Sequence, residues 1–178
     1  MNRRLITLKI VGCFLAVALI TPGVSQAGEK TIGAGVHYWE ALDSLSSLDD
    51  ITDDGYSLMA AFQIRPEGFF SFEFDLEYFD NGFGGANSSA LSPQALVLIG
   101  HGLYGGVGIG VTIADDLSDN ISDPFYIARG GFEFSVLPHL SVDVHASYRG
   151  DSFSELEDFD SDTLTLGVMA RFRLGQRK

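Results

Sequence analysis

The sequence predicts an all-β fold, a closed, eight-stranded, antiparallel, up-and-down transmembrane β-barrel. Three features of the chain predict it. Apolar and polar residues alternate with a period of two in successive segments, acidic residues concentrate in alternate connections, and aromatic residues gather near the two ends of the predicted strands. The first feature indicates β-strands, and the other two are typical of strands that cross a lipid bilayer.

The clearest alternation lies at 69–79, Phe-Phe-Ser-Phe-Glu-Phe-Asp-Leu-Glu-Tyr-Phe. From Phe70 onward every second residue is apolar, and three of the residues between them are carboxylates. One face of this strand is therefore apolar and the other is acidic. The apolar face either packs in the core of a water-soluble protein or contacts lipid in a transmembrane barrel. The remaining segments decide between the two.

Residues 1–27 are typical of a secretory signal peptide. Two arginines precede a short apolar run, a Pro-Gly pair breaks it, and Ser-Gln-Ala offers small residues for cleavage. The predicted organisation is a signal peptide at 1–27 and one outer-membrane barrel domain at 28–178. Cys13, the only cysteine, falls in the leader, so the mature chain has no thiol. The Ile-Val-Gly before Cys13 also resembles a lipoprotein lipobox, which is the alternative to this cleavage.

Eight segments read as strands in chain order. They are 31–42, 56–65, 69–79, 91–100, 103–114, 125–136, 140–149 and 163–174. The fourth lacks a clean alternation because Pro93 lies within it and residues 96–99 are all apolar. In the fifth, glycines occupy one face, which leaves room in a narrow barrel for Tyr104, Trp39 or the arginines.

The connections between these strands alternate in length. Long ones are predicted at 43–55, 80–90, 115–124 and 150–162, and short ones at 66–68, 101–102 and 137–139. An even number of antiparallel strands, with long loops at one end and with tight turns and both termini at the other, is the arrangement of outer-membrane barrels.

Charge is sorted between the two ends. The four long connections contain 16 of the 24 acidic residues and no Lys or Arg, a separation that loops of a soluble protein do not need. After residue 27 the chain has 24 acidic residues and eight Lys and Arg, a net charge of −16. Such a charge argues against nucleic acid as a partner.

Different aromatic residues lie near the two ends of the predicted strands. Five tyrosines lie on the apolar face beside a long connection, and three phenylalanines lie on the same face near the other end. They are Tyr38, Tyr56, Tyr78, Tyr126 and Tyr148, and Phe70, Phe134 and Phe172. Two aromatic belts around an apolar band are the girdles of a membrane-spanning barrel.

The polar face carries five acids and five arginines. A barrel of eight strands is just wide enough for side chains to fill it, and charges confined there must pair because an unpaired buried charge is costly. The sequence therefore predicts an ion-pair network in a closed lumen. Its members are Arg65, Glu73, Asp75, Glu77, Arg129, Glu133, Asp143, His145, Arg149, Arg171 and Arg173.

The chain resembles the small outer-membrane barrels related to opacity proteins and to the barrel domain of OmpA-type proteins. The likeness rests on Gly33-Ala34-Gly35, on Glu77-Tyr78-Phe79, and on the segments 103–110, 130–134 and 140–144. It implies a location in a bacterial outer membrane and, as partners, outer-membrane lipid, lipopolysaccharide and the barrel-assembly machinery. Such barrels commonly end on an aromatic residue, whereas Phe172 is followed here by 173–178, which departs from the pattern that the assembly machinery reads.

Three alternatives compete with this function, which rests on the fold. His145-Ala146-Ser147, with Glu155 or Glu157, resembles the triad of the lipid A deacylases, which are also eight-stranded outer-membrane barrels. The predicted phase points His145 and Ser147 into the lumen, away from a lipid substrate, so no catalytic residue is assigned and the chain is predicted not to be an enzyme. The second alternative is a soluble exported carrier of the lipocalin kind, and the third is a narrow pore.

The acidic segments 49–54 and 155–162 permit two interpretations. They are either solvated loops or weak sites for Ca²⁺ or Mg²⁺, and neither has the spacing of an EF-hand. No cofactor and no metal site are assigned. The predicted function is that of a small, monomeric outer-membrane barrel with a structural or surface-interaction, adhesin-like role, acidic external loops and an ion-paired closed lumen.

Overall fold

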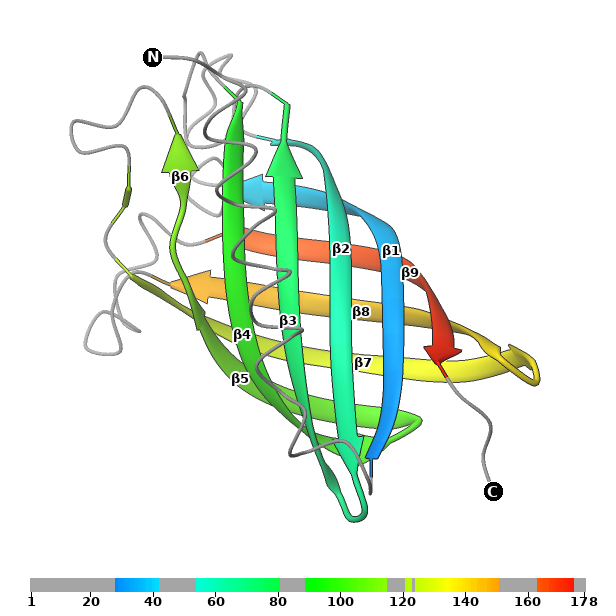
Figure 1. Ribbon diagram of the computed structural model, residues 1–178. Coiled ribbons are helices and arrows are strands. Elements are labelled where there is room, and N and C mark those ends of the chain that lie inside the picture. The colour runs from blue at the N-terminus through cyan, green and yellow to red at the C-terminus, as the bar shows by residue number, and fades with distance from the viewer. Residues whose placement is uncertain are drawn as a thin grey trace.

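The computed structural model describes residues 28–41, 54–80, 89–114, 121–122, 124–150 and 163–174. Its strands wrap around a common axis to form one barrel (Figure 1). The predicted signal peptide at 1–27 lies outside the described residues, as do most residues of the four long connections and the tail after 174. Within the described ranges no helix is long and apolar enough to cross a membrane.

All the described strands pair antiparallel with their neighbours. They are β1 (Gly28–Ala41), β2 (Asp54–Pro66), β3 (Phe70–Phe79), β4 (Ala90–His101), β5 (Leu103–Gly110), β6 (Ile113–Ala114), β7 (Phe125–Leu137), β8 (Leu140–Gly150) and β9 (Thr163–Leu174). Both β5 and β6 pair with β4 and follow one another along it, so they form a single barrel strand. The barrel therefore has eight strands, as predicted.

The sheet closes on itself because β1 pairs with β9 as well as with β2, and β3 pairs with β4. A row of laterally paired residues followed once around the barrel from Lys30 returns to β1 at Glu40, ten positions further along. The row is Lys30, Ile64, Phe72, Val97, Val107, Ala128, Tyr148, Leu164 and Glu40. Eight strands with this stagger tilt by about 40° and enclose an interior that side chains fill.

The two faces of the barrel have opposite chemistry. Phe72 and Leu166 point outward with 45% and 54% of their surfaces exposed, while Glu73 and Arg171 point inward and are 0% and 1% exposed. Exposed apolar side chains surround buried charges, which is the reverse of a water-soluble protein and the arrangement of a barrel in lipid. The soluble-carrier alternative requires the apolar face in a dry centre and is therefore wrong.

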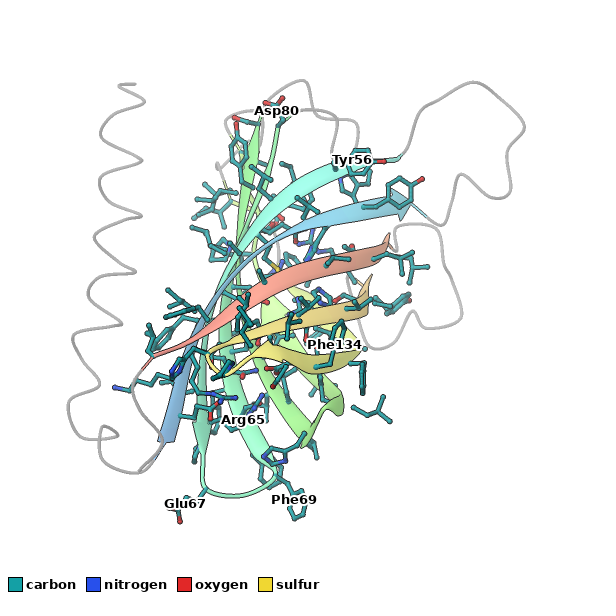
Figure 2. All side chains as sticks on the ribbon, turned by 90° about the vertical axis from the view of Figure 1, so that its right-hand side faces the viewer. Tyr56, Arg65, Glu67, Phe69, Asp80 and Phe134 are labelled. Atoms are coloured by element: carbon teal, nitrogen blue, oxygen red, sulfur yellow. The ribbon has the colours of Figure 1, made fainter. Side chains whose placement is uncertain are left out.

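Aromatic side chains mark both ends of the apolar band. Tyr38 and Tyr56 are paired across β1 and β2 with ring centroids 5.5 Å apart, next to the ends of the strands that the long connections join. At the opposite end the outward side chains include Phe134 and Phe172. Figure 2 shows Tyr56 and Asp80 toward one end of the barrel and Glu67 and Phe69 at the other.

One predicted strand is interrupted. The segment predicted as one strand at 103–114 breaks between β5 and β6, at Val111 and Thr112. Continuing the β4–β5 register past Gln94 places Val111 opposite Pro93, which has no backbone N–H to donate. Only the bond from the Val111 N–H to the Pro93 carbonyl, 3.2 Å, is made there.

The apolar run 96–99 in β4, whose sequence shows no alternation, does alternate in burial. Leu96 and Leu98 are buried inside the barrel, whereas Val97 and Ile99 are exposed on its outer face.

The glycines of β5 make room for apolar side chains. A Cβ on Gly106 would lie 2.6 Å from Leu98, and one on Gly108 would lie 2.6 Å from Leu96. The expectation that these glycines accommodate Tyr104, Trp39 or arginines is thus wrong for this strand. Two glycines outside the expectation do make room for these rings, because a Cβ on Gly131 would meet Tyr104 at 2.7 Å and one on Gly55 would meet Trp39 at 2.8 Å.

Candidate functional site: the ion-paired lumen

Glu73 of β3 is the centre of the buried charge network. Arg171 of β9 contacts both of its carboxylate oxygens, from Nη1 to Oε2 and from Nη2 to Oε1 at 3.1 Å. Arg129 of β7 donates from Nη1 to Oε1 at 2.8 Å and to Oδ2 of Asp75 at 2.7 Å. Gln63 of β2 donates to Oε2 at 2.9 Å. Two arginines therefore hold two acids, and the group joins four strands around the barrel.

A second chain of contacts runs from Arg171 toward the loop end. Its Nε lies 3.5 Å from Asp143, which also accepts a hydrogen bond from the Tyr104 hydroxyl at 3.0 Å. Asp143 contacts Nδ1 of His145, and Nε2 of His145 lies 3.0 Å from Nε2 of His37. The His37 ring continues the chain across the lumen to β3.

Glu77 ends this chain. Its Oε1 contacts Nδ1 of His37 at 2.8 Å and accepts a hydrogen bond from Ser57, while Oε2 accepts one from Gln94 at 2.8 Å. All four side chains are buried. Glu77 is therefore fully hydrogen-bonded, as a buried carboxylate must be.

The turn end of the lumen has a wetter set of ion pairs. Arg65 lies 3.0 Å from Glu133, and Arg173 lies 2.8 Å from Glu29, with side-chain exposures between 11% and 25%. Ser141 donates to Glu133 at 2.6 Å. Exposed pairs contribute little to stability, so these four charges contribute less than the buried group above them.

Arg149 lies at the loop end of the network. Its guanidinium lies 3.7 Å from the centroid of the Phe125 ring, and Nη2 donates to Ser92 at 3.3 Å. A cation over an aromatic face is attracted by the ring quadrupole. Beside it, an apolar plug of Trp39, Phe79, Ala90 and Ala114 fills the loop end of the lumen.

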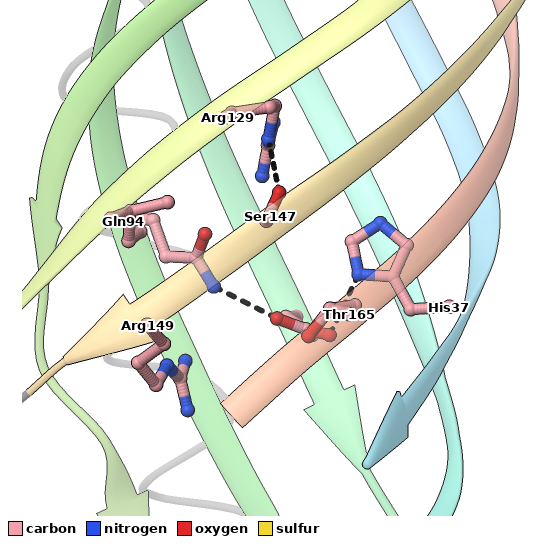
Figure 3. Close-up of a pocket in the computed structure, with 8 residues that line it drawn as sticks. His37, Gln94, Arg129, Ser147, Arg149 and Thr165 are labelled. Carbon is pink, nitrogen blue, oxygen red and sulfur yellow. Dashed lines mark hydrogen bonds and ion pairs between the residues drawn. The ribbon is translucent and has the colours of Figure 1, made fainter. Parts of the chain in front are cut away.

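One small cavity lies within the described interior. A cavity of about 10 Å³ lies at the loop end of the charge network. It is lined by His37, Glu77, Gln94, Ile127, Arg129, Ser147, Arg149 and Thr165 (Figure 3). That volume is about what one water molecule needs. In the part of the barrel that the structure describes, the charge network and the apolar plug lie inside the lumen on either side of this cavity.

The structure places all eleven predicted network residues on the lumen side. Ten of them make ion contacts with one another, with His37 or with Glu29, and the eleventh, Arg149, lines the same cavity as Glu77. The prediction missed His37, Glu29 and Tyr104. His37 could have been found, because it lies on the same face of the first strand as the other inward residues. Glu29 precedes the predicted start of that strand, and nothing in the pattern indicates that the Tyr104 hydroxyl reaches Asp143.

The geometry around His145 and Ser147 is not that of a hydrolytic pair. His145 contacts Asp143 and His37, and Ser147 accepts a hydrogen bond from Nε of Arg129 at 2.8 Å. Both side chains are buried in the lumen rather than facing lipid. The suggested third members, Glu155 and Glu157, lie outside the described residues. That the chain is not an enzyme stays a prediction.

No metal-binding group is found among the described residues, in which no three His, Cys, Asp or Glu side chains are placed to hold an ion. The acidic segment 155–162 and all but the last residue of 49–54 lie outside them. The suggestion of weak Ca²⁺ or Mg²⁺ binding there is therefore untested.

Comparison with known proteins supports the fold. No protein-family model and no curated protein sequence matches the chain. Among solved structures, Neisserial surface protein A is 14% identical with a TM-score of 0.56, over 82% of this chain and 97% of that one. A de novo designed transmembrane β-barrel is 14% identical with a TM-score of 0.52, over 84% and 98%.

The attachment invasion locus protein Ail of Yersinia pestis is 16% identical over 84% of this chain and 100% of that one, but its TM-score of 0.47 carries no argument. At these identities the likeness concerns the fold alone. The predicted location, a bacterial outer membrane, agrees with this fold, and kinship with the opacity and OmpA-type proteins stays a prediction. The chain is similar in fold to small transmembrane β-barrels.

Proposed function

We propose that this chain is a small, monomeric outer-membrane barrel with a structural and surface-interaction role, in which the barrel is a sealed support and the external loops make the contacts. The observation that carries the proposal is the filled lumen. The ion pairs around Glu73 and the apolar plug beside Arg149 occupy the axis, and the cavity between them holds about 10 Å³. A barrel that offers no path through its centre acts through its surfaces.

The charge of the loops defines the partner. The four long connections join strand ends at one end of the barrel, and their sequences contain 16 of the 24 acidic residues and lack Lys and Arg. A surface of one sign attracts partners of the other sign and repels its own. The expected partners are basic surfaces, together with divalent cations that bridge the loops to the phosphates of lipopolysaccharide.

The tight turns and both ends of the barrel domain would then face the periplasm. Barrels of this class present short turns to the periplasm and long loops to the outside. The barrel-assembly machinery would insert the chain from that side.

The first experiment tests the sealed barrel. The purified protein should migrate faster on SDS gels before boiling than after it, and planar bilayers containing it should show no channel steps above those of lipid alone. A designed eight-stranded barrel with a filled interior is the control. Reproducible single-channel steps would contradict the sealed lumen and support the narrow-pore alternative.

The second experiment tests the role of the loops. Cells displaying the protein are mixed with amine-coated and with carboxylate-coated latex beads at low and high salt. We expect the cells to bind amine beads at least tenfold more, and salt to weaken the binding. A variant with every Asp and Glu of 151–162 changed to Asn or Gln should lose most of it.

A loop of the same composition in permuted order is the matched control. It should still bind amine beads, because the proposal rests on charge. If the neutralised variant binds as well as the native protein, the acidic loops are not the interaction surface.

A further inference from the structure

Two histidines face one another in the middle of the buried network. Nε2 of His37, from β1, lies 3.0 Å from Nε2 of His145, from β8, and the rings meet edge to face at 81°. The other nitrogen of each ring contacts a carboxylate, His37 at Glu77 and His145 at Asp143. Four titratable groups are thus joined in series by three contacts.

The number of protons in this series follows from the contacts. Each contact joins two atoms that are acceptors when they carry no hydrogen, so each needs one proton between them. Two neutral imidazoles and two ionised carboxylates carry only two protons. The third contact therefore requires one proton more, wherever along the series it resides.

The other partners of the carboxylates locate that proton. Glu77 accepts hydrogen bonds from Ser57 and Gln94, and Asp143 accepts one from Tyr104. Glu77 is held in the ionised form by these hydrogen bonds, and Asp143 by the Tyr104 hydroxyl together with the Arg171 guanidinium 3.5 Å away. Both Nδ1 atoms then donate, and the extra proton lies between the two Nε2 atoms.

The charge of the buried network leads to the same number independently. Among the described residues its acids are Glu73, Asp75, Glu77 and Asp143, and its arginines are the buried Arg129 and Arg171 and the partly buried Arg149 at its loop end, which gives −4 + 3 = −1. The rim pairs at the turn end sum to zero. One proton on the histidines makes the buried network neutral, as a buried charge cluster requires.

We propose that His37 and His145 form a binding site for one proton, which they share as an imidazolium–imidazole pair and which completes the charge balance of the closed lumen. A proton on Asp75, whose Oδ1 lacks a hydrogen-bond partner among the described residues, would balance the charge equally well. It would leave two Nε2 lone pairs opposed at 3.0 Å, and this geometry excludes it as the only extra proton.

The surroundings favour a proton over a metal ion. Groups from every neighbouring element face the pair: Glu73, Asp75 and Glu77 from β3, Tyr104 from β5, Arg129 from β7, Asp143 and Arg149 from β8, and Arg171 from β9. Two nitrogens bound to one Zn²⁺ at about 2.1 Å would be separated by more than the observed distance if the geometry were tetrahedral. Gly167 lies against both rings, where a Cβ would come within 2.6 Å of His37.

The test counts ring protons directly. Protein labelled with ¹⁵N-histidine is placed in lipid nanodiscs at pH 7.5, and its ring N–H correlations are recorded in water by NMR. We expect three slowly exchanging ring protons from the buried pair, one of them shared by two nitrogens. His101 and His139, the other two histidines of the chain, are exposed and should give only fast-exchanging signals.

Two slowly exchanging protons in place of three would overturn the proposal, as would a stoichiometric metal ion in the purified protein. Neither result would affect the sealed-barrel function, which is measured by conductance and bead binding.

A set of variants tests the charge balance separately. H37Q/H145Q removes the site and leaves an uncompensated negative charge, so the unfolding equilibrium constant should rise at least 100-fold. Adding Glu77→Gln removes that charge and should lower the unfolding equilibrium constant of the double variant at least tenfold. Adding Glu133→Gln, on the partly exposed rim, should not lower it. If Glu77→Gln makes the double variant worse, the histidines serve packing alone and the shared proton is refuted.

Discussion

Replacing Arg171 by methionine tests whether the lumen network holds the barrel together. The side chain is 1% exposed and makes two contacts with Glu73 and one with Asp143. Methionine keeps much of the volume and removes the charge. The loss therefore reports on the ion contacts rather than on a cavity.

The expected loss of unfolding free energy depends on the contacts that each acid keeps after the substitution. The two hydrogen bonds to the charged Glu73, at about 1.5–3 kcal/mol each, set the main range, and the 3.5 Å ion contact with Asp143 adds to it. Glu73 retains Arg129 and Gln63, and Asp143 retains Tyr104 and its histidine, so neither is left bare. Breaking a buried pair typically costs about 3–5 kcal/mol, and we expect about 4 kcal/mol in the free energy of unfolding.

The assay uses the single tryptophan of the chain. Trp39 is buried in the lumen, with its ring centroid 6.3 Å from that of Phe79, so its fluorescence follows opening of the barrel during urea unfolding in lipid vesicles. Arg173→Met, on the partly exposed rim, is the control and should cost less than about 1 kcal/mol. Adding Glu73→Gln to Arg171→Met should recover about 2 kcal/mol. If Arg171→Met costs less than about 1 kcal/mol, the network does not stabilise the barrel as argued.

Two further substitutions probe the inner and outer faces. Gly167→Ala should destabilise the barrel by about 2 kcal/mol, because the added Cβ would lie 2.6 Å from His37 and 2.7 Å from His145. Gly130→Ala is the control: the atom nearest to its added Cβ is 4.0 Å away, so its stability in urea should change by less than about 0.5 kcal/mol. Equal losses for the two variants would contradict the packing argument. Val168 is half exposed and lies between the aromatic belts. Val168→Arg should lower the free energy of unfolding in vesicles by about 3 kcal/mol, whereas Val168→Leu should leave it almost unchanged. If the arginine is tolerated, this face of the barrel contacts water rather than lipid.

The sequence was sufficient to predict the strands and their faces because a period of two is a local property. All eight strands are confirmed, and the inward position of Glu73 and Arg171 follows from the phase of their own segments. What the phase does not specify is the partner across the barrel. Arg171 and Glu73 are 98 residues apart, and their contact depends on a ten-residue stagger that accumulates over every strand pair.

Two further features lie beyond the pattern for the same reason. The face of Arg149 predicts its place in the lumen, but not that its height along β8 brings it over the Phe125 ring. The break after β5 required the pairing of Val111 with Pro93, which neither segment reveals by itself. Non-local register decides both, and a single sequence does not encode it visibly.

The long range of the lumen contacts suggests why the interior is charged rather than apolar. A strand with leucine on both faces would expose apolar surface on each side before insertion and would be prone to aggregate. Charges on one face avoid this, but they are satisfied only when β9 reaches β1, which brings together Arg171 with Glu73 and, 108 residues apart, His37 with His145. A half-closed barrel leaves these groups without partners at a cost of several kcal/mol. Closure of the barrel is therefore expected to be all-or-none. The network that stabilises only the closed barrel is the same network that fills its lumen.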